Sequence, residues 1–185
     1  MFAFLRRRIH AHREPSAGRK LYFAVLAQSR LPAFYGSFGV PDTVDGRFDL
    51  VVLHAVLVFR RLRALGPEAA LLSDETFEVM TADLDRSVRE LGIGDMAVGR
   101  RVKAMARAFY GRAQAYESGL SGTESLEDAL RRNVYRTVTA PDALVGRLAE
   151  YVRAAAAGVG RQSLEDLAAG RPGFPPTPYR AADGS

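Results

Sequence analysis

The sequence has no cysteine among its 185 residues, which excludes disulfide bonds, thiol catalysis and cysteine-ligated metal ions. Only three histidines are present, and His10 and His12 lie close to the start of the chain. The most apolar stretch, residues 50–59, is ten residues long and is too short to span a bilayer. Hydrophobic residues make up 48% of the chain and charged residues 25%, as in ordinary globular proteins. We therefore expect one globular domain.

Positive charge is concentrated in the first 30 residues, which carry seven cations and one acid, whereas the remaining residues carry nineteen cations and twenty acids. This balance predicts neither a basic face on the body of the protein nor binding to nucleic acid. The apolar, arginine-rich start predicts contact with an anionic membrane surface through Phe2, Arg6, Arg7 and Arg8. The alternative is a frayed tail that ends at Pro15.

From Gly18 onward apolar residues recur at intervals of three and four, and no segment alternates like a strand. The fold is therefore predicted to be all-α, an irregular bundle of six or seven helices. Helices are expected over residues 21–26, 50–59 with Asp49 as the cap, 73–91 and 95–116, and after capping motifs at Ser121, Thr139 and Ser163. Residues 34–46 are predicted to form an aromatic loop because they are rich in glycine and proline.

The domain is predicted to span residues 15–170. It is preceded by a basic, apolar tail, residues 1–14, and followed by a proline-rich tail, residues 171–185, which is either disordered or draped on the surface.

Catalytic and cofactor motifs are missing. Gly92, Gly94 and Ala97 match a dinucleotide-binding spacing, but a helix rather than a strand is predicted before them. His54 lies in the most apolar helix and is predicted to be a hydrogen-bonded core residue. No metal site, cofactor or catalytic residue is predicted, so the protein is not expected to be an enzyme; a small helical enzyme is an alternative for which no acid, base or nucleophile can be nominated.

Two blocks of sequence carry a family resemblance. The first contains residues 34–35 (FY), 39–43 (GVPDT), 46–50 (GRFDL) and 53–54 (LH). The second contains residues 83–85 (DLD), 89–95 (RELGIGD), 108–112 (AFYGR) and 115–116 (AY), with Val98, Lys103 and Met105 between them. Together, across residues 19–118, they resemble the ubiquinol-cytochrome c chaperone family, the assembly factors of the cytochrome bc1 complex.

The resemblance implies an all-helical, non-catalytic protein that holds newly made cytochrome b. In mitochondria such proteins act with a small partner protein near the ribosomal exit. The chain lacks a long mitochondrial presequence, so it looks like a bacterial member, and we expect it in the cytoplasm at the inner face of the cytoplasmic membrane; whether a small partner exists here stays open.

The blocks also supply the candidate partner-binding residues: Phe34, Tyr35, Phe38, Pro41, Asp42, Arg47, Asp49, Asp95, Arg112 and Tyr116. Two readings remain for them, because the rings either offer apolar surface or plug the bundle, and the polar residues either contact a client or form an internal network that fixes two loops. An alternative function is a lipid- or quinone-binding carrier at the membrane surface. A closed tunnel would favour the carrier, and a shallow open groove would favour the holder.

Overall fold

The computed structural model describes residues 14–90 and 95–177, without the side chains of residues 88, 95–103, 105 and 106. All regular structure in these ranges is helical, so the all-α prediction is confirmed. The long helices are α1 (Ala17–Ser29), α3 (Val44–Leu65), α4 (Ala70–Glu90), α5 (Asp95–Ser121) and α7 (Asp142–Gly160). The shorter ones are α2 (Ala33–Gly36), the 3-10 turn η1 (Pro67–Ala69), α6 (Leu126–Asn133) and α8 (Leu164–Ala168).

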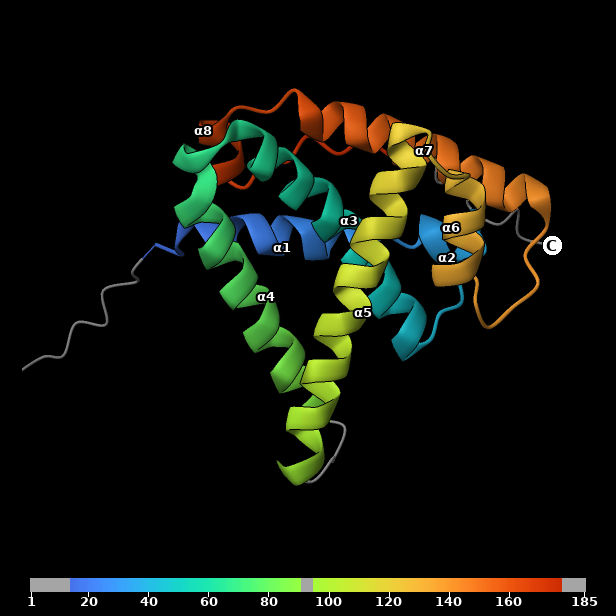
Figure 1. Ribbon diagram of the computed structural model, residues 1–185, viewed down its shortest axis with the longest axis horizontal. Helices are drawn as coiled ribbons and strands as arrows, with labels where there is room; N and C mark the ends of the chain where they lie inside the picture. The colour runs from blue at the N-terminus through green and yellow to red at the C-terminus, as the bar shows by residue number, and fades with distance from the viewer. Residues whose placement is uncertain (1–13, 91–94, 178–185) are drawn as a thin grey trace, which may run out of the picture.

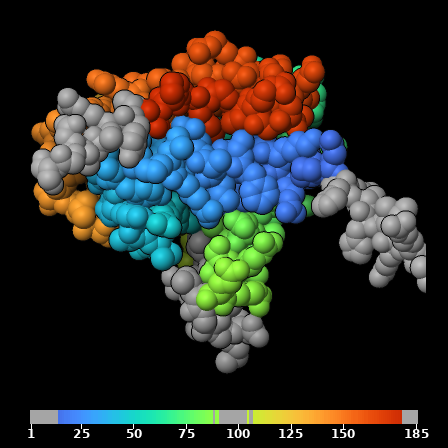
Figure 2. Space-filling model, turned by 180° about the vertical axis from the view of Figure 1, so that it is seen from behind, coloured from blue at the N-terminus to red at the C-terminus, as the bar shows by residue number. Residues whose placement is uncertain are grey.

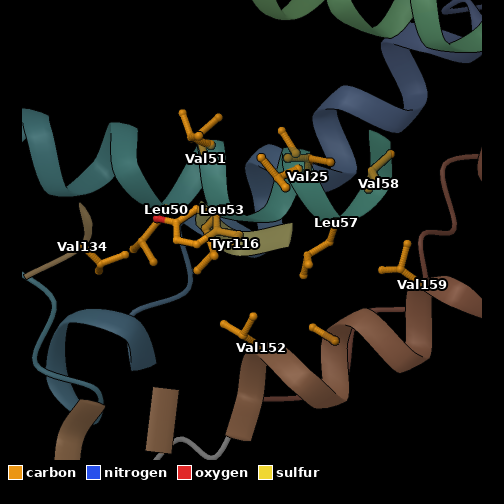
Figure 3. Packing of buried hydrophobic residues seen from close by; sticks show 14 of the residues in the cluster. Val25, Leu50, Val51, Leu53, Leu57, Val58, Tyr116, Val134, Val152 and Val159 are labelled. Atoms are coloured by element: carbon orange, nitrogen blue, oxygen red, sulfur yellow. The ribbon is translucent and has the colours of Figure 1, made fainter. Parts of the chain in front are cut away.

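Helix α3 is the centre of the single domain. Its residues from Leu50 to Val58 are all buried, as expected for a helix that is apolar on every side. Helix α1 packs on one side and α7 on another, and Leu57 lies between α3 and α7 with Val152 and Val159 (Figure 3). Helices α4 and α5 converge as a V whose narrow end projects away from the other helices (Figure 1). The body therefore has a filled core, and the V forms an arm beside it.

The helices α3, α6 and α7 are not capped by the residues that the sequence predicts. Helix α3 begins after Thr43, whose hydroxyl accepts from the Gly46 N–H at 3.1 Å, so Asp49 is not a cap but lies inside the helix. Helix α6 is capped by Ser125 rather than Ser121, and α7 follows Pro141 with no side-chain cap.

Other boundaries were predicted more closely. Helix α5 begins at Asp95 as expected, and Ser163 and Asp166 form the predicted capping box of α8. The third predicted helix begins at Ala70 instead of residue 73, because η1 leads directly into α4. The aromatic segment was wrongly predicted to contain no helix, since α2 forms there.

Two glycines permit close approaches that position the aromatic segment and the arm. A Cβ on Gly46 would lie 2.0 Å from the Pro41 carbonyl oxygen, so only glycine lets residues 37–43 rest on the first turn of α3. A Cβ on Gly18 would lie 2.7 Å from the backbone of Glu75, where α1 crosses α4. Both contacts hold elements that line the candidate site.

The described part of the proline-rich segment lies along the core. Pro172 is buried, and the Phe174 ring meets the His54 ring edge-on at 5.1 Å between centroids. The Gln28 side chain of α1 donates to the Pro175 carbonyl at 3.3 Å. Residues 171–177 are therefore draped on the body, which is one of the two predicted states.

Candidate functional site

The structure separates the predicted site residues into three groups. The first is buried: Phe34, Phe38 and Tyr116 are 0%, 3% and 0% exposed. The Phe34 and Phe38 rings stack at 5.5 Å between centroids, and both contact Tyr151 of α7. These rings plug the bundle, which is the second of the two readings given above, and they offer no apolar surface.

The second group lies on the surface around the start of α3. Arg47 donates from Nε to Asp42 Oδ1 at 2.6 Å, and its guanidinium carbon lies 5.9 Å from the centroid of the Tyr35 ring. The hydrogen bonds from Arg47 lower the pKa of the Asp42 carboxyl. Tyr35 is half-buried and donates to the Ser29 carbonyl at 3.3 Å, and Pro41 is half-buried against Gly46. Asp42 and Arg47 thus form an exposed ion pair, with Tyr35 and Pro41 half-buried beside it.

The third group is a charged cluster centred on Asp49, which is 1% exposed. Arg112 of α5 donates from Nη2 to Asp49 Oδ1 at 2.6 Å. Arg136, which follows α6, donates from Nε to Asp49 Oδ2 at 3.5 Å and from Nη2 to Asp45 at 2.7 Å. Burial raises the pKa of Asp49, and the two arginines partly offset that effect. The cluster ties α3, α5 and the segment after α6 together, and of the predicted polar site residues it joins only Asp49 and Arg112.

Groove A is the open hollow above this cluster, with a volume of about 480 Å³. Seen from behind, it lies between the start of α3 (cyan) and α4 (green), beside α1 (blue) (Figure 2). Its apolar walls come from four helices and include Tyr22, Leu26, Phe48, Val51, Leu84 and Ala108. Its charged rim consists of Arg30, Asp45, Arg47, Asp83, Arg112 and Arg136. The groove thus brings Arg47 and Arg112 together, two of the predicted site residues.

The electrostatics of groove A favour binding rather than catalysis. The Arg112 guanidinium lies 5.5 Å from the Phe48 ring centroid, and Tyr22 donates to Asp83 at 2.7 Å across the rim. Burial and the nearby Asp83 carboxylate raise the pKa of Tyr22, so its hydroxyl stays protonated. Arg112 Nε is buried with no acceptor among the described residues. An apolar floor with charged ends suits an apolar helix that carries polar groups at its ends.

The remaining predicted site residues lie outside the described part. Asp95 is the first residue of α5, but its side chain is not described. Phe2, Arg6, Arg7 and Arg8 precede residue 14, so the predicted membrane contact stays a prediction.

His54 is a satisfied core residue, as predicted. Its Nδ1 donates to the Leu50 carbonyl, and its Nε2 accepts from the Tyr151 hydroxyl, both at 2.8 Å. Tyr151 in turn accepts from Gln28 at 2.9 Å. Burial lowers the pKa of His54 to about 4, so the ring is neutral at pH 7. The partners of His54 were not predicted, because Gln28 and Tyr151 carry no signal in the sequence beyond their place on helical stripes.

Groove B, which the sequence does not predict, is a second open hollow of about 880 Å³. It lies between the end of α3, the start of α4 and the end of α5, and it shares no lining residue with groove A. Its rings, Phe59, Phe77 and Phe109, fall on helical apolar stripes in the sequence, which predict burial but not which rings meet.

Two features are absent from the part of the chain that the structure describes. No helix among residues 14–90 and 95–177 is both long and apolar enough to cross a bilayer. Within the same ranges, no three histidine, aspartate or glutamate side chains gather to hold a metal ion.

Comparisons with known proteins agree with the resemblance in the two sequence blocks. The model of a family described as ubiquinol-cytochrome C chaperone matches residues 36–174. A crystal structure of the Cbp3 homolog from Brucella abortus superposes with a TM-score of 0.77 and 34% sequence identity, and the match covers 87% of this chain and 90% of that chain.

Two curated relatives are both described as ubiquinol-cytochrome c reductase complex assembly factor 1. The protein from Mus musculus is 22% identical over 138 residues, which cover 74% of this chain and 47% of the relative. The protein from Drosophila melanogaster is 27% identical over 139 residues, which cover 72% of this chain and 54% of the relative. The chain spans about half the length of the curated relatives it matches.

Proposed function

Because this chain belongs to the ubiquinol-cytochrome C chaperone family, we propose that it assists assembly of the cytochrome bc1 complex by holding newly made cytochrome b in groove A. The family is one of chaperones rather than enzymes, which agrees with the prediction of a non-catalytic protein. The bc1 role is supported by the two relatives described as assembly factors of the ubiquinol-cytochrome c reductase complex.

The observation that carries the proposal is the apolar groove above the Asp49 cluster. A client helix that has not yet entered the membrane exposes apolar side chains to water, and burying them in an apolar groove is favourable. Groove A, at about 480 Å³, accepts a few side chains of one helix at a time. The arginines on its rim are hydrogen-bond donors only, and they can donate to carbonyls and carboxylates of the client. Such contacts are reversible and need no nucleotide.

The alternative function, a lipid or quinone carrier, is less well supported. A carrier shields its cargo in an enclosed cavity, whereas grooves A and B both open to solvent. An open groove, unlike a closed tunnel, favours the holder. We propose that the holder acts at the inner face of the cytoplasmic membrane, where a cytochrome b helix is inserted. Whether it acts together with a small partner protein stays open.

The test is complementation of a gene deletion in the organism that encodes the protein. Ala104 lines groove A, so Ala104→Glu places a charge on its apolar wall. Ala154→Glu is the matched control on an exposed helical position of α7. We expect deletion to lower the amount of assembled bc1 complex, and we expect the control variant but not Ala104→Glu to restore it at equal protein level.

A photo-crosslinking side chain at residue 104 identifies the client directly. Capture of cytochrome b supports the proposal, and a crosslink from position 154 should not appear. Normal bc1 levels without the gene would overturn the assembly role, whereas capture of a different bc1 subunit would overturn only the choice of cytochrome b.

A further inference from the structure

Groove B has an aromatic floor and an exposed aromatic mouth. The Phe59, Phe77 and Phe109 rings meet edge-on, with centroid separations between 5.9 and 6.1 Å. Tyr110, the residue after Phe109 on α5, lines the groove and is 63% exposed. A tyrosine with an apolar ring and a polar tip is suited to the boundary between water and a membrane.

A cationic hollow of about 470 Å³ adjoins groove B. Arg60, Arg61 and Arg63 at the end of α3 line it, together with Glu117 of α5 and the last turns of α7. Arg60, Arg63 and Glu117 line both hollows, so they form the wall between groove B and the cationic hollow. An apolar space and a basic space thus lie side by side.

The cationic hollow has more donors than the protein uses. Glu117 accepts from Arg60 at 3.2 Å and from Arg63 at 3.4 Å, and Arg61 Nε donates to the Gln162 carbonyl at 2.9 Å. Each guanidinium has five N–H donors, so most of them have no acceptor among the described residues. Three cations face one carboxylate, which leaves a local positive surplus. The surplus is confined to this hollow, so it is a local feature that the nearly balanced charge of the body does not reveal.

We propose that the cationic hollow binds the phosphate of an anionic phospholipid while groove B and Tyr110 contact the apolar boundary of the same membrane. The guanidinium fork matches phosphate oxygens in pairs, and such contacts strengthen where water is partly excluded. A single-stranded nucleic acid would need several exposed rings on which bases stack, but Tyr110 is the one exposed ring among the four that line groove B, and it meets the Phe109 ring edge-on at 5.7 Å. The lipid is therefore the occupant that fits both hollows.

This lipid site is independent of the proposed client site. Groove A is lined by α3 residues from Val44 to Val51, and groove B by α3 residues from Val56 onward. A membrane bound at the end of α3 therefore leaves groove A unoccupied. The experiments below use purified full-length protein and vesicles, so their failure would not bear on bc1 assembly.

The first experiment measures binding to vesicles of phosphatidylcholine, with and without phosphatidylglycerol. The double variant Arg60→Gln with Arg63→Gln removes two cations that share Glu117. The control, Arg132→Gln with Arg153→Gln, removes two cations that pair with Glu124 and Glu127 elsewhere on the surface. Because each cation near an anionic surface strengthens binding about fivefold, we expect a loss of about 25-fold for the first variant and little change for the control.

Several outcomes would overturn the lipid site. Equal losses in both variants would mean that only overall charge matters, and a loss seen only after removal of residues 1–13 would assign the contact to the N-terminal segment. Failure of the full chain to bind anionic vesicles would also overturn it. Loss of affinity for an RNA homopolymer, with vesicle binding unchanged, would assign the hollow to a different polyanion. Circular dichroism of each variant serves as the control that it is folded.

The second experiment uses the absence of tryptophan from the chain. Tyr110→Trp places one fluorescent indole at the mouth of groove B, and Val138→Trp places one at an exposed site before α7. The cationic hollow lies at the other end of α7, about 27 Å along the helix. We expect a blue shift with anionic vesicles for Tyr110→Trp and none for Val138→Trp. A shift for Val138→Trp alone, or for neither variant, would overturn the proposed orientation.

Discussion

Asp49 and His54 are both buried on α3 within the same sequence block, yet the protein accommodates them in different ways. Asp49 is bound by Arg112 and Arg136, two cations that line the open groove A. His54 is neutral and is enclosed by the Phe34, Tyr151 and Phe174 rings, and both of its ring nitrogens have neutral partners.

This difference in charge distinguishes a cluster that can contact a partner from one that only stabilises the fold. A neutral residue can be buried deeply once its hydrogen bonds are made, whereas a buried carboxylate needs cations beside it. The desolvation cost of those cations is lowest where water still reaches them. The Asp49 cluster is therefore at the edge of the core, where Arg112 keeps an unused donor. The His54 cluster has no unused donor or acceptor on its ring, so it stabilises the bundle and offers nothing to a partner.

Arg112→Ala tests the charged cluster most directly. The substitution leaves Asp49 buried with only the 3.5 Å contact from Arg136, and we expect the free energy of unfolding to fall by about 3–5 kcal/mol. Urea denaturation followed by circular dichroism measures the change. Arg47→Ala is the matched control, since it breaks the exposed pair with Asp42 and should cost less than about 1 kcal/mol. Equal losses in the two variants would mean that the cluster is no more than a surface ion pair.

The neutral cluster should make stability depend on pH. The pKa of His54 falls from 6.5 in the unfolded chain to about 4 in the fold, so unfolding takes up a proton below pH 6.5. The stability associated with the neutral ring is complete above pH 6.5 and declines as the pH falls toward 4. Between pH 7 and pH 5 we expect a loss of about 2 kcal/mol beyond that of His54→Gln, measured by urea denaturation at both pH values. Parallel declines for the two proteins would contradict the assignment.

The smallest expected effects come from removing the hydroxyl groups of two buried tyrosines, one in each cluster. The Tyr151 hydroxyl donates to His54 and accepts from Gln28, so Tyr151→Phe should cost about 1–2 kcal/mol. The Tyr116 hydroxyl is buried beside the Asp49 cluster with no partner among the described residues, so Tyr116→Phe should leave the unfolding free energy within about 0.5 kcal/mol of the original. Thermal unfolding of both variants distinguishes them. A large loss for Tyr116→Phe would indicate a bound water molecule that joins it to the cluster.

The position of the α3 cap shows what apolar periodicity predicts and what it leaves out. The run from Leu50 to Phe59 led to Asp49 as the cap, but α3 begins at Val44 after Thr43. The first turn of α3 is exposed except at Gly46, so no apolar stripe in the sequence predicts where the helix begins. An apolar run marks where a helix is buried, and a helix begins wherever its first N–H groups find acceptors.

Charge counting was limited in the same way. The body carries nearly equal numbers of cations and acids, and this correctly implies no extended basic face. Arg60, Arg61 and Arg63 nevertheless gather beside one another at the end of α3. Their only carboxylate neighbour in the hollow, Glu117, is contributed by α5. A local surplus appears only when the helices that supply the acids are placed.

Short-range pattern was enough for the all-α class, the core position of His54 and the capping box of α8, because each depends on residues a few positions apart. The motif order was enough for the family. Packing between distant segments turned Phe34 and Phe38 inward, joined Asp49 to Arg112 and Arg136, and opened two grooves on different parts of α3. Those contacts depend on how whole helices fill one core together, which no local pattern records.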